Sequence, residues 1–428
     1  MTETESERKH QALDQFATYI NPQRVRVMRA AGLDIVEAER DGPWVFDVDG
    51  RRFLDCFTSA GSFNVGRRNA RVVAAAHAAV DRLDHGNFLL CSSEKAALAA
   101  KLAEITPGDL SCTMFGTGGG EAIDFAIKLA RGSTGRPTVV STVNGYHGHT
   151  GFALSAAGRE AFRRPFEPLM PEFVQVPFGD VGALEQALGE HTAAVLLEPI
   201  QGESGIHPAS AHFLRILREV CDRYGALLMF DEVQCGLGRT GDWCGWRSIA
   251  PDVVPDAVSW AKGIAGGFPL GAIWVRDRPL TLNSGGAISL ADLFGPGTHG
   301  TTFGGTPLVC SGALEVLRVI EEEGLLANAR TIGAYAKESI LGLKSPFITE
   351  VRGVGLMLGI QLTASFATHA GSGTRPPSLW LVDRLHEAGM LTIPAGTHTI
   401  RWLPPLNVTR DEVDQAVAIL GGVLRKNV

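Results

Sequence analysis

The chain has 428 residues, of which 45% are hydrophobic and 20% are charged, and its formal net charge is −7. A chain of this length exceeds what one hydrophobic core usually serves, so we expect more than one domain. The acidic balance argues against binding to nucleic acid or to an anionic membrane surface, and no apolar run approaches the roughly 18 residues needed to span a bilayer.

The N-terminus and the cysteines indicate the cellular compartment. The first residues are charged and lack the apolar region of a signal peptide, which favours a cytoplasmic location. The seven cysteines are an odd number and lie scattered along the chain. Cys235 and Cys244 do not form a C-x-x-C pair, so the pattern predicts neither a zinc site nor a disulfide framework. We therefore expect no bound metal.

The N-terminal part of the chain combines helical patterns with one hairpin. Residues 1–20 are expected to form a polar lead-in followed by a helix. Apolar and polar residues then alternate around Asp49-Gly50, which is typical of a β-hairpin. Two helical patterns follow, at 70–83 and 94–105.

From Cys112 onward, short apolar runs alternate with helical stretches. The alternation predicts an α/β fold with a mostly parallel sheet and crossover helices. The runs are PTVVSTV at 137–143, AAVLLEPI at 193–200, ALLMFDEV at 226–233, DAVSW at 256–260 and GAIWV at 271–275.

The pattern changes again near Gly305. Residues 306–326 are predicted to form one long helix that leads out of the sheet. Two strand-like segments follow, at 351–362 and 400–407. Thr409 and Glu412 then have the spacing of a capping box that opens the final helix. These elements predict a smaller α+β domain at the C-terminus.

Lys262 and Asp231 are the strongest candidates for chemistry. Each follows one of the apolar runs, and ligands of open α/β sheets bind beyond the carboxyl ends of such strands. Lys262 is the one lysine among eight that stands after an apolar run and before a glycine cluster. A lysine can form a Schiff base with a carbonyl cofactor, and a carboxylate can pair with a pyridinium nitrogen. The combination predicts pyridoxal 5′-phosphate.

Two further segments fit this cofactor. Gly118, Gly119 and Gly120 open a helical pattern, and free backbone N–H groups at a helix N-terminus favour an anion such as a phosphate. Tyr146 offers a flat face on which a pyridine ring could stack, and His147 lies beside it. Taken singly, each segment is also consistent with a tight turn or a core aromatic.

The order of these segments resembles that of the class III aminotransferases, the ornithine, acetylornithine and 4-aminobutyrate group. The similarity covers nearly the whole chain after residue 20. The matching motifs are GTGGGEA at 116–122, YHG at 146–148, EPIQGE at 198–203, DEVQ at 231–234, AKGIAGGFPLGA at 261–272, HGTTFGG at 299–305 and RWLPPL at 401–406.

The resemblance implies the type I pyridoxal-phosphate transferase fold, in which a mostly parallel central sheet is joined to a smaller α+β domain. On this basis we expect three parts along the chain. They are an N-terminal segment that joins the small domain, a large cofactor-binding domain, and a C-terminal small domain, at residues 1–50, 51–310 and 311–428.

The resemblance also implies roles at the cofactor. Lys262 would hold the Schiff base and then move a proton on the substrate, and Asp231 would pair with the ring nitrogen. Gln234 would approach the ring hydroxyl. The glycines at 118–120 would bind the phosphate, with Tyr146 and His147 beside the ring. Thr302 would reach the same phosphate from the neighbouring subunit, which implies a homodimer with shared active sites.

For the substrate, the resemblance assigns Arg401 to a carboxylate, because guanidinium can donate two parallel hydrogen bonds. Glu203 would neutralise Arg401 when a substrate presents an amine instead. His149 stands where relatives have an arginine for a second substrate carboxylate, so 2-oxoglutarate does not follow as the acceptor. The implied reaction transfers an amino group from a primary amine or ω-amino acid to a 2-oxo acid.

Two alternatives remain open from the sequence. One keeps the cofactor and changes the reaction to that of a racemase, an aminomutase or a decarboxylating transaminase, since one scaffold can host several chemistries. The other is a non-catalytic relative that acts as a binding protein, which an intact Lys262, Asp231, Gln234 and Arg401 disfavour.

Overall fold

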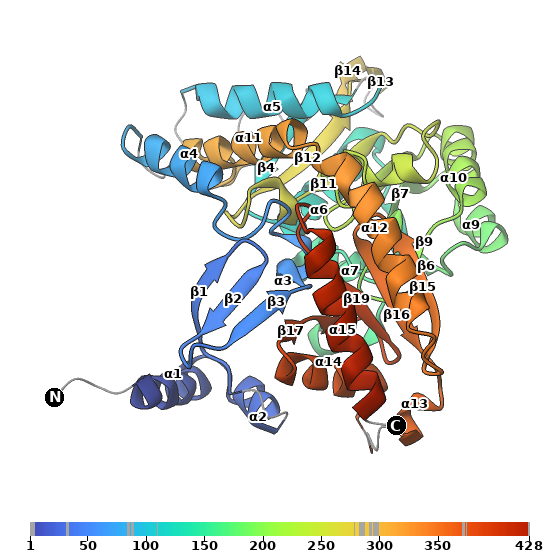
Figure 1. Cartoon of the computed structure of the whole chain (residues 1–428). Coiled ribbons are helices and arrows are strands. Elements are labelled where there is room, and N and C mark those ends of the chain that lie inside the picture. The colour runs from blue at the N-terminus through green and yellow to red at the C-terminus, as the bar shows by residue number, and fades with distance from the viewer. Residues whose placement is uncertain are drawn as a thin grey trace.

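A seven-stranded sheet forms the centre of the computed structural model (Figure 1). Its strands, in chain order, are β4 (Leu110–Gly116), β5 (Thr138–Thr142), β6 (Phe173–Val176), β7 (Thr192–Leu197), β10 (Leu227–Asp231), β11 (Ala257–Trp260) and β12 (Gly271–Arg276). Their spatial order is β4-β12-β11-β10-β7-β5-β6. Strand β12 runs antiparallel to both neighbours, and the other neighbouring pairs run parallel. The predicted α/β class with a mostly parallel sheet is confirmed.

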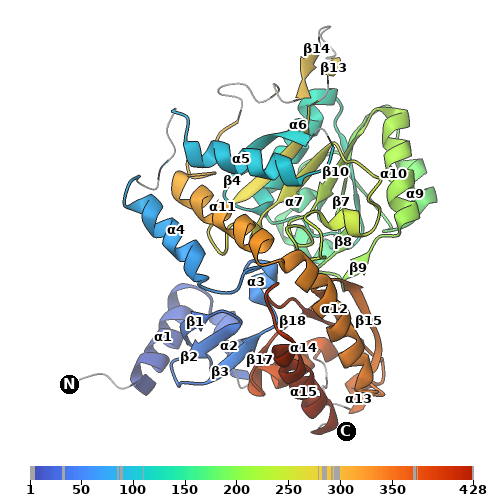
Figure 2. The same cartoon turned by 45° about the horizontal axis from the view of Figure 1, so that its top comes forward.

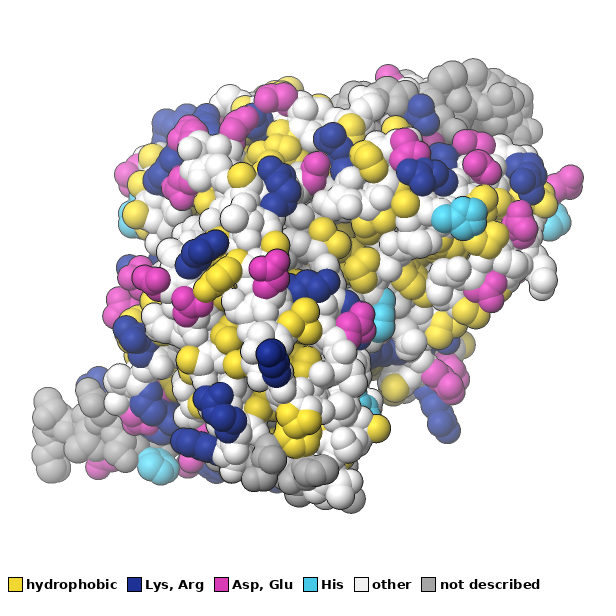
Figure 3. Space-filling model, turned by 45° about the vertical axis from the view of Figure 1, so that its right-hand side comes forward, with side chains coloured by type: hydrophobic (Ala, Val, Ile, Leu, Met, Phe, Trp, Pro, Cys, Tyr) yellow, Lys and Arg dark blue, Asp and Glu magenta, His cyan; other side chains and the backbone are white. Residues whose placement is uncertain are grey.

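The structure describes most of the chain. The described residues are 5–30, 34–83, 86, 90–108, 110–277, 279–281, 287–290, 293, 299–369, 373 and 375–426. Among them, no helix is both long enough and apolar enough to cross a membrane. On the face shown in Figure 3, basic and acidic side chains are interspersed rather than gathered into a patch of one sign.

The central strands are apolar throughout because both of their faces are covered. In β10, Leu228 and Phe230 belong to one buried cluster, whereas Leu227 and Met229 belong to a second cluster on the opposite face. Successive side chains of a strand point to opposite faces, so a strand between two helical layers needs an unbroken apolar run. Each buried side chain of this size contributes about 1.5–3 kcal/mol of transfer free energy.

Helices form a layer on each face of this sheet (Figure 2). One face is covered by α5 (Ser93–Ile105), α10 (Ala211–Tyr224) and α11 (Pro307–Glu322), whose apolar residues share one buried cluster with the strands. The other face is covered by α6 (Gly119–Thr134) and α7 (Gly151–Ala156). The strands are therefore buried between helices, as a parallel sheet requires.

The N-terminal segment forms its own small sheet. It contains α1 (Glu5–Tyr19), α2 (Pro22–Ala30), β1 (Glu37–Asp41), β2 (Trp44–Asp47) and β3 (Arg52–Asp55). Strands β2 and β3 pair antiparallel across the Asp49-Gly50 turn, which confirms the predicted hairpin. Strand β17 (Met390–Leu391) adds to the same sheet beside β3, so the N-terminal and C-terminal parts of the chain share one sheet.

The helix predicted over 306–326 is wrong in one respect, because the structure divides it in two. Helix α11 ends at Glu322, and α12 (Leu325–Gly342) begins three residues later. Gly324 between them has a φ of +64°, a left-handed conformation that ends an α-helix. The apolar periodicity continues across this break, which explains why the pattern alone suggested one helix.

A four-stranded antiparallel sheet dominates the C-terminal part. Its strands are β15 (Ile348–Val354), β16 (Met357–Leu362), β19 (Thr399–Trp402) and β18 (Ile393–Pro394), and the helices around it are α12, α13 (Phe366–His369), α14 (Pro377–Glu387) and α15 (Arg410–Lys426). Before α15, the Glu412 carboxylate accepts the backbone N–H of Thr409 at 2.8 Å, and the Thr409 hydroxyl accepts that of Glu412 at 3.3 Å. The predicted capping box is confirmed.

Short elements complete the described part of the fold. The helices predicted at 70–83 and 94–105 are confirmed as α4 and α5. The boundaries of the three predicted domains stay a prediction. The remaining elements are α3 (Thr58–Gly61), α4 (Ala70–Val80), α8 (Glu160–Arg163), α9 (Val181–Ala187), β8 (Ile200–Gln201), β9 (His207–Pro208), β13 (Pro279–Thr281) and β14 (Ala287–Ser289), with single turns of 3₁₀-helix at Arg164–Phe166, Gly245–Ser248 and Lys262–Ile264.

Candidate active site

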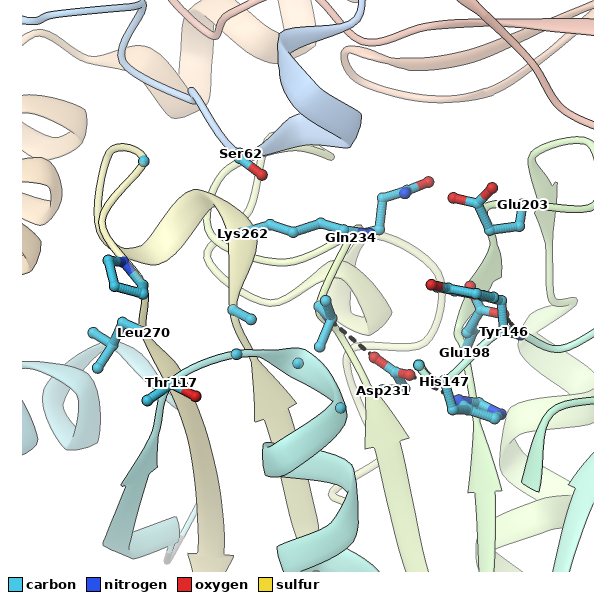
Figure 4. Close-up of a pocket in the computed structure, with 18 of the residues that line it drawn as sticks. Ser62, Thr117, Tyr146, His147, Glu198, Glu203, Asp231, Gln234, Lys262 and Leu270 are labelled. Atoms are coloured by element: carbon cyan, nitrogen blue, oxygen red, sulfur yellow. Dashed lines mark hydrogen bonds and ion pairs between the residues drawn. The ribbon is translucent and has the colours of Figure 1, made fainter. Parts of the chain in front are cut away.

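The carboxyl ends of β4, β5, β7, β10 and β11 meet along one edge of the central sheet, where they border a cavity of about 290 Å³ (Figure 4). Each strand delivers one candidate residue to this cavity at or just beyond its end: Gly118, Tyr146, Glu198, Asp231 and Lys262. Residues up to 144 positions apart in sequence therefore face one space, from Gly118 to Lys262. This is where open α/β sheets bind ligands.

Lys262 lies two residues beyond β11, and its side chain extends into the cavity. Its backbone φ is +45°, which is uncommon for a residue with a side chain and is typical of strain held at functional sites. Burial lowers the pKa of Lys262 below its ordinary value, and the nearby Arg401 guanidinium acts in the same direction, against the carboxylate of Glu203. A lowered pKa favours the neutral amine, the nucleophilic form.

Asp231 and His147 form a buried pair beneath the cavity. The Asp231 Oδ2 atom lies 2.7 Å from Nδ1 of His147, and Oδ1 accepts the backbone N–H of Val233 at 3.0 Å. Burial alone would lower the pKa of His147, but the Asp231 carboxylate outweighs it and raises the pKa. A carboxylate held in this way offers a partner for a cationic ring nitrogen in the cavity.

Glu198 is a buried carboxyl to which the sequence analysis gave no role. Its Oε1 atom accepts the backbone N–H of Tyr146 at 2.8 Å, and Oε2 accepts that of Gly202 at 3.0 Å. Burial, with the nearby Asp231 charge adding to it, raises the pKa of Glu198 to about 7. Glu198 is the first polar residue after the apolar run of β7, as Asp231 is in β10, so the same signal could have found it.

The glycine-rich turn begins α6, which packs with α7 on one face of the central sheet and is the longer of these two helices. Gly118 is the N-cap of α6, and the backbone N–H groups of Gly119 and Gly120 begin the helix at the edge of the cavity. Thr117 also lines the cavity, and its own backbone N–H is donated to Glu121 at 2.6 Å. Unpaired first-turn N–H groups and the helix dipole favour a negatively charged group here.

Arg401 and Glu203 form a two-point ion pair, in which Glu203 lines the cavity and Arg401 is not among the lining residues. The Arg401 nitrogens donate to the two Glu203 carboxylate oxygens at 2.5 and 2.9 Å, and Nη1 also lies 3.2 Å from the Gln234 Oε1 atom. The Arg401 side chain is 1% exposed. Burial would raise the pKa of Glu203, but Arg401 outweighs it and lowers the pKa. Glu203 is therefore held in its charged form.

The remaining predicted residues lie around this centre. The Tyr146 ring lines the cavity, and the exposed His149 meets its edge with ring centroids 5.5 Å apart. Thr302 is exposed, and the described residues that line the cavity of its own chain do not include it. Ser62, which the sequence did not single out, faces the cavity from the N-terminal part of the chain (Figure 4).

Comparison with known families decides the identity. The profile of the family "Aminotransferase class-III" matches residues 27–424, almost the entire chain. The chain belongs to the class III aminotransferases. The match spans every strand and loop that borders the cavity, so the arrangement described above is that of a whole family member rather than of one shared motif.

Individual aminotransferases are similar to this chain over most of their length. The chain is 42% identical to an uncharacterized aminotransferase of Archaeoglobus fulgidus, over 97% of this chain and 94% of that protein. It is 38% identical to the acetylornithine aminotransferase of Methanosarcina mazei, over 90% and 91% of the two chains. The crystal structure of an amine transaminase from an uncultivated Pseudomonas species, in a PLP-bound form, superimposes with a TM-score of 0.80 at 31% identity, over 92% and 95%.

As a class III aminotransferase, the protein is a pyridoxal-phosphate-dependent enzyme of the type I fold, and the cavity fits that cofactor. It offers an amine for the aldehyde, a buried carboxylate for the ring nitrogen, and a helix N-terminus for the phosphate: Lys262, Asp231 and Gly119-Gly120. Because its relatives are transaminases, transamination is favoured over racemisation, aminomutase chemistry or a purely binding role.

Proposed function

We propose that this enzyme moves an amino group from a primary amine or ω-amino acid to a 2-oxo acid, in two half-reactions that share one cavity. Bound pyridoxal phosphate supplies a carbonyl that takes up the amino group and a ring that withdraws electrons while the substrate C–H bond breaks. The residues of the chain bind and orient both substrates and move the proton.

Lys262 and Asp231 are the proposed catalytic residues. The Lys262 amine would take a proton from the substrate carbon that bears the amino group and return it to the carbonyl carbon of the cofactor. Asp231, held by His147, keeps the ring nitrogen protonated through its charge. The 2.7 Å contact between Asp231 and His147 and the lowered pKa of Lys262 support these roles.

The other proposed contacts fix the position of the cofactor. Gly118, Gly119 and Gly120 would hold the phosphate through backbone N–H groups at the start of α6. Tyr146 and His147 would lie beside the ring. Gln234 would reach the ring hydroxyl, which its position on the cavity wall supports.

The observation that carries the substrate assignment is the Glu203–Arg401 pair. When Glu203 occupies Arg401, at 2.5 and 2.9 Å, the cavity has no free cation at that point and accepts the amine end of a substrate. When Glu203 turns away, the buried guanidinium is free for the carboxylate of a 2-oxo acid. One site then serves two substrates of different charge. His149, which is exposed, supplies no guanidinium for a second carboxylate.

We further propose a cytoplasmic homodimer in which Thr302 of each subunit completes the phosphate site of its partner. The exposure of Thr302, away from the cavity of its own chain, supports this arrangement. A sedimentation mass equal to the single 45.6 kDa chain would contradict it.

The experiment is a comparison of the two half-reactions in wild type and Glu203→Gln, with ω-amino acids, simple primary amines, pyruvate and 2-oxoglutarate as substrates. Without the carboxylate, Arg401 stays uncompensated, so we expect the kcat/KM for the amine donor to fall about tenfold or more. The 2-oxo acid half-reaction should keep its kcat while its KM falls, because Arg401 no longer has a competing carboxylate. Glu160→Gln, at an exposed position of α8, is the control. Equal losses in both half-reactions would refute the assignment.

A further inference from the structure

The turn that carries Glu203 is contacted by three side chains on the side that faces away from the cofactor cavity. This Glu203 turn, residues 202–205, connects β8 and β9. The Arg159 Nη2 atom donates to the Glu203 carbonyl at 2.7 Å, and the Arg352 Nε atom donates to the Gly205 carbonyl at 2.7 Å. The His207 ring lies beside the backbone of Ser204 between them. The turn is thus held through the carbonyls on either side of Ser204.

The three side chains come from different parts of the fold. Arg159 precedes α8, His207 is in β9, and Arg352 is in β15 of the C-terminal sheet. They line a second, open cleft of about 580 Å³, which the Glu203 turn separates from the cofactor cavity. The Glu203 carboxylate belongs to the cofactor cavity, whereas the carbonyl of the same residue is held in the second cleft by Arg159.

The turn itself is built for this close approach. A Cβ atom added to Gly205 would lie 2.6 Å from Nε2 of His207 and 2.8 Å from Nη2 of Arg352, so a larger residue would push both side chains away. Ile206, the next residue, has a φ of +58°, a conformation that costs energy for a branched side chain and persists only when its surroundings impose it.

The two arginines are themselves fixed. Arg352 also donates to the Gln361 and Thr399 side chains, each at 3.0 Å. The Arg159 guanidinium lies over the Phe162 ring at 5.6 Å, and that ring in turn meets the edge of Tyr146. Donors that are held in place in this way cannot follow the turn if it moves, so they oppose its movement.

We propose that Arg159, His207 and Arg352 are positioning residues that set the balance of the two substrates. These three residues, the outer clamp, fix the backbone of the Glu203 turn and so keep the carboxylate within hydrogen-bond distance of Arg401. Glu203 can then leave Arg401 only by rotation of its side chain. The inference rests on the proposed exchange of Glu203 at Arg401, and it adds residues that touch neither substrate nor cofactor.

Loosening the clamp is expected to affect the two substrates in opposite directions. Loosening the turn weakens the Glu203–Arg401 pair, so Arg401 becomes more available to a carboxylate and less well neutralised for an amine. In Arg159→Gln and in Arg352→Gln, we expect the kcat/KM for the amine half-reaction to fall about fivefold and the KM for the 2-oxo acid to fall by a similar factor. Arg159→Lys, which keeps a cationic donor, should restore most of the wild-type ratio.

The experiment measures both half-reactions in these variants, with melting temperature and bound cofactor recorded for each. Arg164→Gln, an exposed arginine five residues along the chain, is the matched control and should leave the ratio unchanged. Parallel losses in both half-reactions would show a merely structural role and overturn the proposal, as would unchanged ratios.

A double variant separates the clamp from the pair on which it acts. If Arg159 works through Glu203, then Arg159→Gln adds no further shift of the ratio in a Glu203→Gln background. An additive shift would overturn the proposal. If Glu203→Gln shifts the ratio of the two half-reactions but neither clamp variant does, the proposal for the clamp is refuted and the proposed function stands. If Glu203→Gln itself leaves this ratio unchanged, both proposals are refuted.

Discussion

Lys262 places an amine that is charged at neutral pH in the unfolded chain into the cavity of the folded protein. Its pKa is lowered in the folded protein, chiefly by burial. A group with a depressed folded pKa contributes stability that is present above its unfolded value and is lost as the pH falls. The Lys262 amine therefore lowers the stability of the cofactor-free fold at neutral pH.

This cost can be measured. We expect Lys262→Met, studied without cofactor, to melt a few degrees above cofactor-free wild type at pH 7, because Met fills the same space without a charge. The difference should shrink as the pH rises toward 10.5, the ordinary pKa of lysine, where the wild-type amine is neutral in both states. Thermal melts of both proteins between pH 7 and pH 10 provide the test. If the difference in melting temperature does not change with pH, the lower stability of the wild type is not due to the charge of Lys262.

At the same scale, the sequence predicts some site residues and leaves others hidden. Lys262 and Asp231 could be predicted because each is a polar residue at the end of an apolar run. Glu198 stands in the same place after β7, so the same signal could have found the residue. Its role, which is to accept two backbone N–H groups, is not visible in the sequence. Arg159 acts on a carbonyl 44 residues away, so only the folded chain relates the two.

At the scale of elements, the phosphate turn depends on a second loop that packs against it. Gly148 has a φ of +126°, and a Cβ atom at this position would lie 2.9 Å from the Cα atom of Gly120. The loop after β5, which carries Tyr146 and His147, therefore approaches the start of α6 backbone to backbone. No larger residue fits at position 148 without moving the N–H groups proposed for the phosphate.

We accordingly expect Gly148→Ala to weaken cofactor binding by about tenfold or more, because backbone atoms rather than a flexible side chain would have to move. Gly179→Ala is the matched control, since Gly179 also has a positive φ, +84°, but a Cβ there meets nothing within 4 Å. Equilibrium dialysis of pyridoxal phosphate against both variants measures the effect. Equal affinities in the two variants would contradict the role given to the close approach of Gly148 and Gly120.

Most elements could be predicted from periodicity, because the central strands are apolar on both faces and the helices on one. The break between α11 and α12 could not, because the apolar stripe continues on both sides of Gly324. A short left-handed interruption changes the direction of the chain without changing its composition.

At the scale of the whole molecule, one buried arginine joins parts of the chain that are far apart. Arg239 is fully buried and donates to the Asn64 side chain at 2.6 Å, to the Leu356 carbonyl at 3.2 Å and to the Pro404 carbonyl. Pro404 lies three residues beyond Arg401, so these contacts also hold the chain just after β19, the strand that carries the guanidinium proposed to bind the substrate. The sequence could not predict this, since all three partners are uncharged.

The central claim is that these distant segments assemble one pyridoxal-phosphate site that exchanges amino groups, and the most direct test is the visible absorption spectrum of the purified enzyme. We predict a band from lysine-bound cofactor in wild type that an amine donor bleaches and a 2-oxo acid restores, and that Lys262→Met lacks. A band that persists unchanged during turnover would contradict transamination. Absence of any band in wild type supplied with pyridoxal phosphate would contradict the site itself.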